Sequence, residues 1–372
     1  MLPAVPSDVE IIRRLASETG PKPIAGRWAR PPAPLETTVL SVMRNEQPRI
    51  EDFLHHYRAL GVRHFAIVDN ASTDGTRQYL ATEPDVCLFA ADGPFDWRAK
   101  HGWITSLIER LGRNHWYLLC DADEHCVFEG SDTLPLSSLV AHLERLKRSR
   151  ARGALVDLYR DGPIAAWSRP RQHRLNEYYR YFDAGTYREH RNALLTSRTG
   201  GPRQRLMGHL NPDFRPELTK YPLFRLGAED VVYNPHVIWP PTQDEADPCL
   251  IGILHYKFDG ELFERLREAV TSRRYWNASA EYEIYLQCLR ADPAAGFFSG
   301  ASRLYRSPGD LLKFGVIESA QYSLTAPRTE MTHAFAEAIR TSARISRATA
   351  LGRRHGEICG SFERGAAGAL QP

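Results

Sequence analysis

The sequence lacks three features that would place it in a specialised class of protein. None of its apolar runs approaches the roughly 18 residues that a membrane-spanning helix needs. Residues 1–20 lack the basic start and apolar stretch of a secretory signal. None of the six cysteines stands in a paired CxxC spacing, which argues against a zinc knuckle and favours reduced thiols. We therefore expect a cytoplasmic protein with no transmembrane segment.

The chain also lacks a strong net charge. Its 48 basic and 45 acidic residues leave a formal charge of +3, and no recognition-helix or aromatic–basic pattern points to nucleic acid. With 42% hydrophobic and 25% charged residues, the 372-residue chain is long enough and apolar enough for a large globular core. We expect a small, phosphate-bearing partner and no nucleic acid, and the basic loops leave peripheral contact with a membrane open.

Strand-like and helix-like segments alternate in the first part of the chain. Apolar runs predict strands at 37–43, 64–69, 86–90 and 116–120, and amphipathic segments predict helices at 48–61, 74–82 and 99–112. This alternation at short spacing predicts an α/β fold with a mostly parallel central sheet flanked by helices. Each strand-like run ends in polar residues, and ligands bind at the carboxyl edge of such sheets.

The composition changes along the chain and suggests four regions. A short helix and a proline-rich connector are predicted in residues 1–35. The main domain is predicted over 36–260, with a nucleotide-binding half at 36–130 and an acceptor half at 131–260. A C-terminal helical extension is expected at 261–330, followed at 331–372 by a polar tail in which we expect partial disorder.

The stretch "WYLLCDADEH" (116–125) ends a buried strand in three acids, Asp121, Asp123 and Glu124. Two acids separated by one residue at a strand tip can share a divalent cation. Mg²⁺ and Mn²⁺ prefer oxygen ligands and commonly combine a few carboxylates with substrate phosphates. For Glu124, a charge on a solvated turn is an equally good interpretation.

A second stretch, "IVDNASTDGT" (67–76), ends a strand in Asp69 and turns into a helix. Ser72, Thr73 and Asp74 are ordinary turn and helix-capping residues. Asp69 stands at the strand end, where a carboxylate can accept a hydrogen bond from a base or a ribose. It is therefore the residue of this stretch to which we assign a function.

Three stretches in this order and spacing, "TVLSVMRNE", "HFAIVDNASTDGT" and "WYLLCDADEH", resemble the nucleotide-binding half of family 2-like glycosyltransferases with the GT-A fold. The resemblance covers residues 37–130. It extends to about 260 through "GGPRQRLMG", "LTKYPLF", "NPH" and "LHYKF", which are similar to a bacterial subgroup of that superfamily. The downstream Glu-Asp pair that supplies the catalytic base in this family is not evident, since "GAED" (227–230) looks like a hairpin turn.

The resemblance implies roles for particular residues. It implies a nucleoside contact at Asp69 and a metal and diphosphate site at Asp121 and Asp123, with Mn²⁺ or Mg²⁺ as the cofactor. His255 is the candidate to complete the metal shell, and His236 is its rival. The candidate donor-binding residues are Arg44, Asp69, Asn70, Lys100, Asp121, Arg203, Arg205 and Lys220, with Arg98 as a weaker one. For the last three of the eight, and for Lys100, a solvated surface charge is the alternative.

These observations predict a metal-dependent glycosyltransferase that moves a sugar from a nucleotide-sugar donor, UDP-linked by analogy, to a hydroxyl of a glycan, lipid or protein acceptor. Analogy also favours inversion, which requires a general base. Asp230, Glu229 and Asp213 are the candidates for that base. Two other functions stay open, a metal-dependent phosphohydrolase and a catalytically inactive nucleotide- or sugar-binding module.

Overall fold

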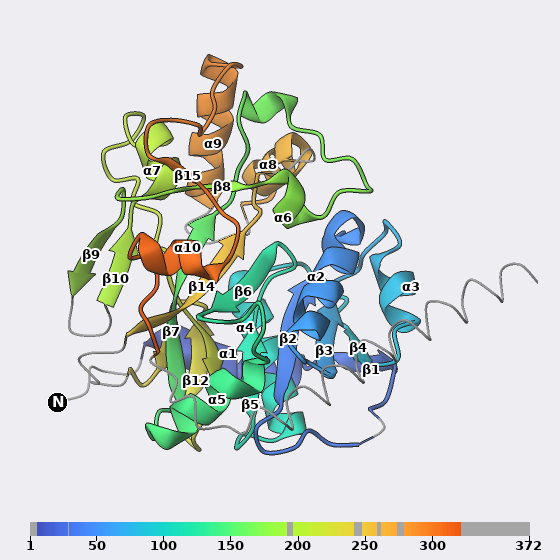
Figure 1. Ribbon diagram of the computed structural model, residues 1–372. Helices are drawn as coiled ribbons and strands as arrows, with labels where there is room; N and C mark the ends of the chain where they lie inside the picture. The colour runs from blue at the N-terminus through green and yellow to red at the C-terminus, as the bar shows by residue number, and fades with distance from the viewer. Residues whose placement is uncertain are drawn as a thin grey trace, which may run out of the picture. The chain divides into compact units, whose positions relative to one another are not determined.

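A large mixed sheet forms the centre of the protein. The structure, a computed structural model, describes residues 6–28, 30–191, 196–241, 248–258, 262–273 and 279–320. In this part of the chain nine strands pair in the order β1-β4-β3-β2-β5-β11-β7-β14-β6 (Figure 1). Their bounds are β1 Lys22–Ala25, β2 Thr37–Met43, β3 His64–Asp69, β4 Val86–Ala90, β5 Trp116–Leu119, β6 Glu124–Phe128, β7 Arg150–Asp157, β11 Thr219–Phe224 and β14 Cys249–His255.

Six of these nine strands point the same way. Strands β4, β3, β2 and β5 pair in parallel. Strands β7 and β14 are parallel to each other and run in the same direction as those four. Strands β1, β11 and β6 run antiparallel to their neighbours. The predicted α/β class with a mostly parallel sheet is therefore confirmed. Strand β2 has β3 on one side and β5 on the other, so the strand order reverses between them, where such sheets bind ligands. The architecture is consistent with a GT-A-like, Rossmann-type fold.

Amphipathic helices connect the parallel strands, as the sequence predicts. Helix α2 (Gln47–Ala59) buries Ile50, Phe53, Leu54 and Tyr57, which recur at helical spacing. The other crossover helices are α3 (Thr76–Ala81) and α4 (Trp97–Leu111), whereas α5 (Leu136–Arg145) connects β6 and β7, which run in opposite directions. Helix α4 begins at Asp96, whose carboxylate accepts hydrogen bonds from the backbone N–H groups of Arg98 and Ala99. This cap fixes the start of α4 and therefore the position of Lys100 in its first turn.

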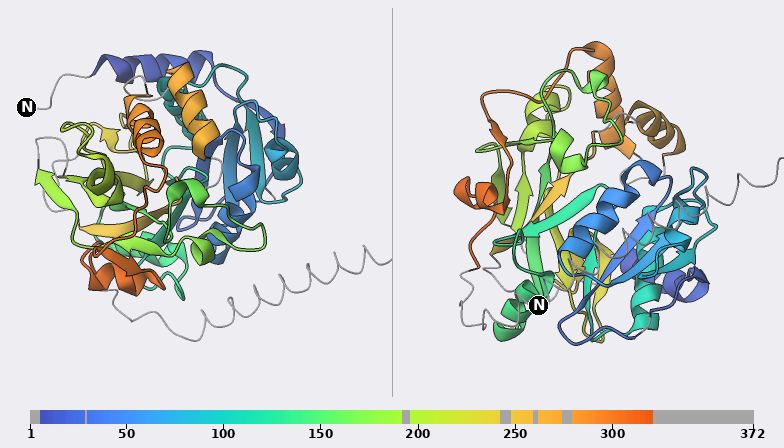
Figure 2. Two further views of the ribbon diagram at one scale, coloured as in Figure 1. Left: turned by 90° about the horizontal axis from the view of Figure 1, so that it is seen from above. Right: turned by 45° about the vertical axis from the view of Figure 1, so that its right-hand side comes forward.

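The N-terminal segment packs on α4 rather than forming a separate unit. Helix α1 (Ser7–Glu18) lies along α4 (Figure 2), and a Cβ atom at Gly102 would stand 2.8 Å from the Cβ of Leu15. The proline-rich connector predicted in residues 1–35 contains strand β1, which the sequence did not indicate and which pairs antiparallel with β4. Without β1, the backbone of β4 would form an exposed sheet edge, and covering such edges protects a sheet from unwanted pairing.

Smaller elements complete the second half of the described chain. They are η1 (Ile164–Ala166), α6 (Leu175–Tyr178), β8 (Tyr181–Asp183), β9 (Arg188–Arg191), β10 (Thr196–Thr199), α7 (Gly201–Met207), β12 (Val231–Asn234), β13 (Val237–Trp239), α8 (Leu262–Ser272), α9 (Ala280–Ala291), β15 (Ser302–Leu304) and α10 (Pro308–Lys313). Tyr285 and Leu289 of α9 share a buried cluster with Tyr256 and Phe258, which anchors α9 beside the end of β14. The predicted C-terminal helical extension is thus present, while the predicted tail lies outside the described residues.

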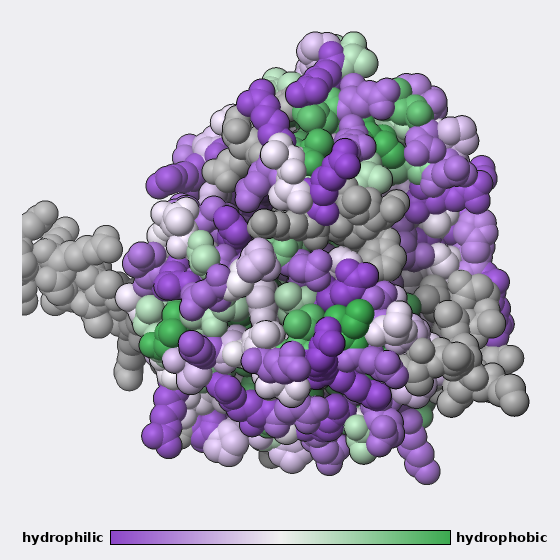
Figure 3. Space-filling view, turned by 180° about the vertical axis from the view of Figure 1, so that it is seen from behind, coloured by the Kyte–Doolittle hydropathy of each residue, from purple (hydrophilic) through white to green (hydrophobic). Residues whose placement is uncertain are grey.

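The described helices are too short or too polar to span a bilayer. On the face opposite to that of Figure 1, hydrophilic residues predominate and the hydrophobic ones form small, separate areas (Figure 3). The described residues of this face therefore form no broad apolar surface.

Candidate functional site

The acidic turn lies at the carboxyl edge of β5, beside the point where the strand order reverses. After β5 the chain crosses Asp121 and Asp123 and enters β6 at Glu124, whose backbone N–H donates to the Asp121 carbonyl at 3.0 Å. Strand β6 was not expected from the sequence. It pairs antiparallel with β14, and this register sets Glu124 directly opposite His255. Strand β14 therefore places His255 beside the acidic turn.

Two of the three acids are paired with lysines. The Lys100 ammonium on α4 lies 2.5 Å from the Asp121 carboxylate, and the Lys220 ammonium on β11 bonds to Glu124. Burial would raise the pKa of Asp121, but the charge of Lys100, then that of Lys220, holds it below its usual value. The lysines thus keep Asp121 charged and neutralise the turn where two carboxylates would otherwise repel each other.

Asp123 and His255 have the spacing of two ligands to one cation. The Nε2 atom of His255 lies 3.6 Å from Oδ2 of Asp123, too far for a hydrogen bond. Two donors each about 2.1 Å from a shared ion, at ligand angles of about 90–120°, lie about 3.0–3.6 Å apart. Asp123, Glu124 and His255 each offer one atom within 4.8 Å of the others. The residues present therefore fit a divalent cation, although Asp121 is directed to Lys100 and is outside this group.

The surroundings of Asp123 favour its ionised form. Burial alone would raise the pKa of Asp123, but the charge of His255, then that of Arg49, lowers it well below its usual range. Nearby, burial raises the pKa of Glu46 to about 7 against the opposing charge of Arg49, and the negative charge of Asp123 adds to this rise. Asp123 is therefore charged at neutral pH and able to bind a cation, whereas Glu46 is only partly ionised there.

Asp69 ends β3 at the same edge of the sheet and is completely buried. Its Oδ2 atom accepts a hydrogen bond from Nε of Arg77 at 2.6 Å, whereas its Oδ1 atom has no partner among the described residues. The neighbouring Asn70 uses its amide N–H groups to hold the carbonyls of Ala91 and Gly93. An unsatisfied buried acceptor at this position suits a donor from a ligand, while Asn70 has a role in holding the loop after β4.

The other predicted donor-binding cations lie apart from the acidic turn or are already engaged. Arg205 bonds to Asp183 at 2.8 Å, and Arg98 bonds to Asp8 at 2.6 Å. Arg44 is exposed and lies 3.8 Å from Glu268 of α8. Arg203 bonds through Nε to Asp157 and through Nη1 to Glu281, while its Nη2 atom has no partner among the described residues. Of the predicted cations, Lys100 and Lys220 are those that directly contact the acids of the turn.

The structure does not bring Glu229 and Asp230, two of the three candidate bases, to the acidic turn. Glu229 and Asp230 lie in the loop after β11, where Arg113 holds the carbonyls of Gly227 and Asp230. Because β11 runs antiparallel to β5, this loop lies at the amino end of β5, whereas the acidic turn lies at its carboxyl end. Asp213 is exposed in a turn after α7. The "GAED" stretch is indeed a turn between two strands.

His236 has a different environment from His255. Its Nδ1 atom lies 2.5 Å from the Thr219 carbonyl oxygen, and burial followed by the charge of Lys220 lowers its pKa. In the described part of the chain it is not a member of the possible metal-ligand group. His255 is thus the histidine that the fold brings to Asp123.

Sequence reasoning missed Asp157, the last residue of β7. Its carboxylate lies 2.7 Å from Nδ1 of His255 and 2.7 Å from Nε of Arg203, and it is almost completely buried. A signal was available, because "GALVDLY" (153–159) is an apolar run with an acid near its end, like the strands that end at Asp69 and before Asp121. Only the position of β7 beside β14 makes that acid part of the site.

Next to the acidic turn in the sequence, the ring of His125 on β6 stacks on that of His56 on α2, with the ring centroids 4.4 Å apart. Burial lowers the pKa of His56 to about 4 and that of His125 well below its usual value. Both rings are thus neutral in the folded protein and take up protons on unfolding near pH 6.5. The contribution of these neutral rings to the free energy of unfolding is therefore fully present above pH 6.5 and is lost as the pH falls toward 4.

From these shifts we expect His125→Phe to make the protein less sensitive to acid. Between pH 7 and pH 4.5, the wild type should lose more unfolding free energy than the variant, by about 2 kcal/mol. Urea unfolding at the two pH values measures this difference, and His190→Phe, at an exposed position of β9, is the control. Equal losses in the wild type and in His125→Phe would contradict the neutral, buried state of this ring.

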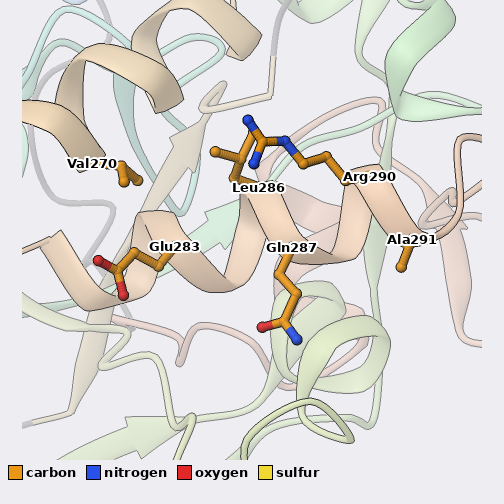
Figure 4. Close-up of a pocket in the computed structure, with 6 residues that line it drawn as sticks. All are labelled: Val270, Glu283, Leu286, Gln287, Arg290 and Ala291. Atoms are coloured by element: carbon orange, nitrogen blue, oxygen red, sulfur yellow. The ribbon is translucent and has the colours of Figure 1, made fainter.

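A hollow of about 490 Å³ lies apart from this chemistry, between α8 and α9 (Figure 4). Leu286, Gln287 and Arg290 of α9 and Val270 of α8 are among the side chains that line it. None of the acids of the turn contributes to its wall. The candidate site is therefore assigned from the carboxyl edge of the sheet and not from this hollow.

No protein-family model and no curated protein match this sequence. Among solved structures, Staphylococcus aureus TarS (residues 1–349) is similar over 34% of this chain and 36% of its own, with 16% identity and a TM-score of 0.24. UDP-glucose pyrophosphorylase from Acinetobacter baumannii is similar over 36% and 60%, with 11% identity and a TM-score of 0.25. For 4-diphosphocytidyl-2C-methyl-D-erythritol synthase the shares are 36% and 64%, with 16% identity and a TM-score of 0.24. Similarities this low say nothing about activity.

Proposed function

We propose that this protein is a metal-dependent glycosyltransferase that uses a nucleotide-sugar donor, UDP-linked by analogy, and transfers the sugar with inversion to an acceptor hydroxyl. The observation that carries the proposal is the pair of Asp123 and His255, spaced as cation ligands at the carboxyl edge of a GT-A-like sheet. The three N-terminal motifs that resemble family 2-like enzymes meet at that same edge.

In this proposal each part of the edge has one task. Asp69 accepts a hydrogen bond from the nucleoside through its unsatisfied Oδ1 atom. Asp123 and His255 hold Mn²⁺ or Mg²⁺, which when bound neutralises the charge that develops on the leaving diphosphate. Lys100, in the first turn of α4, shifts from Asp121 to the donor phosphates when they arrive. The acceptor, whether glycan, lipid or protein, approaches from the opposite side of the sugar.

The test is a thermal-shift screen of nucleotide sugars with and without Mn²⁺, followed by product analysis for each ligand that stabilises the protein. Stabilisation that needs both Mn²⁺ and the donor is expected, because a ligand that binds only the folded state raises the melting temperature. A donor that stabilises should then release nucleoside diphosphate in the presence of acceptor. Release of inorganic phosphate instead would indicate a phosphohydrolase, and binding of UDP without turnover across a broad acceptor panel would indicate an inactive binding module.

A further inference from the structure

His255 lies between two strands that each set an acid opposite it. In the register of the sheet, His255 of β14 pairs with Glu124 of β6 and with Asp157 of β7. Residues opposite each other on neighbouring strands have side chains on the same face of the sheet. The imidazole therefore lies between the acidic turn and the end of β7, with Nδ1 2.7 Å from Asp157 and Nε2 3.6 Å from Asp123.

The bond to Asp157 determines which ring nitrogen carries the proton. An ionised carboxylate can only accept hydrogen bonds, so Nδ1 of His255 must be the donor. The Nε–H of Arg203 donates to the other carboxylate oxygen of Asp157 at 2.7 Å, so this carboxylate is paired with a cation on its far side. In the neutral ring, the lone pair is then on Nε2, the nitrogen nearer Asp123.

Asp157 is itself held in place by a buried arginine. Nε of Arg203 donates to the second oxygen of Asp157 at 2.7 Å, and another nitrogen of the same guanidinium donates to Glu281 at 2.6 Å and to the Tyr285 hydroxyl at 3.0 Å. Arg203 is 3% exposed, and both of its other partners come from α9. Arg203 thus supports Asp157 through Nε, while its Nη2 atom has no hydrogen-bond partner among the described residues.

We propose that Asp157 is a positioning residue, which orients the His255 ring and fixes its tautomer so that the Nε2 lone pair faces the cation position beside Asp123. The inference rests on the metal dependence proposed above and adds to it a residue that never touches the cation. Partners that donate or accept at the outer nitrogen of a ligating histidine commonly contribute 10–100-fold in metal affinity.

The test compares Asp157→Asn with Asp183→Asn. Asp183 is a suitable control because it is also completely buried and bonded to an arginine, Arg205, but no histidine among the described residues bonds to it. Mn²⁺ affinity, measured by calorimetry or by electron paramagnetic resonance without nucleotide, should be 10–100-fold weaker in Asp157→Asn than in the wild type. It should change by less than about threefold in Asp183→Asn, and UDP affinity without metal should be unchanged in both.

Several outcomes would overturn the proposal. Wild-type Mn²⁺ affinity in Asp157→Asn would do so, and if turnover nevertheless fell, Asp157 and His255 would serve proton transfer instead. A wild type that binds no Mn²⁺ either alone or in the presence of UDP would contradict the proposed metal dependence as a whole, so the two failures are distinguishable. If Asp157→Asn does not fold, ¹⁵N NMR of the wild-type histidines replaces it. A His255 ring that is protonated on Nδ1 and unprotonated on Nε2 supports the inference, and the opposite tautomer refutes it.

Discussion

Asp123→Asn is expected to lower Mn²⁺-dependent sugar transfer by at least about 100-fold while leaving the fold intact. The amide has the shape of the carboxylate but no charge, so it binds a divalent cation weakly and neutralises less of the leaving diphosphate. Because the side chain is 24% exposed in a turn after β5, its replacement leaves no cavity and breaks no strand pairing. Steady-state turnover at saturating Mn²⁺ measures the loss of activity, and a melting curve measures whether the fold is retained.

The matched control is Asp132→Asn, an exposed acid in the turn that follows β6. It removes the same charge without touching the carboxyl edge of the sheet, so turnover should stay within about twofold of the wild type. Turnover of Asp123→Asn equal to that of the control would refute the assignment of Asp123 to the metal.

Lys220→Met is expected to lower the free energy of unfolding by about 3–5 kcal/mol, since it removes one partner of a buried ion pair. Lys220 is 7% exposed and Glu124 only 2%, so the carboxylate left behind has little access to water. Burial would lower the pKa of Lys220, yet the negative charge of Glu124 raises it, which shows how strongly the two charges depend on each other. Urea unfolding at pH 7 measures the loss.

Two further variants separate this effect from a general loss of charge. Adding Glu124→Gln to Lys220→Met should restore part of the stability, because no unpaired carboxylate then remains. Arg14→Met removes an exposed ion pair with Glu18 on α1 and should change the free energy of unfolding by less than about 1 kcal/mol. A loss in Lys220→Met no greater than in Arg14→Met would show that the Glu124 charge is well solvated.

Local patterns predicted the first half of the sheet well. Strands β2, β3, β4 and β5 and the helices between them lie where alternation and helical spacing indicated. Successive parallel strands joined by crossover helices are built from contacts close in sequence. The prediction was poorer for β1 and β6. β1 lies in a proline-rich stretch and pairs with β4, and β6, which begins with the polar residues Glu124 and His125, pairs with β14.

The sequence by itself determined that polar residues follow several buried strands, and therefore that Asp69, Asp121 and Asp123 lie at one edge of a parallel sheet. It also determined which side chains can bind phosphate or a cation. Only the tertiary structure decided their partners: Lys100 for Asp121, Lys220 for Glu124, and Asp157 for His255, 98 residues away. The physical reason is that a strand's periodicity specifies which face is buried, whereas its neighbours are selected by the packing of the whole sheet.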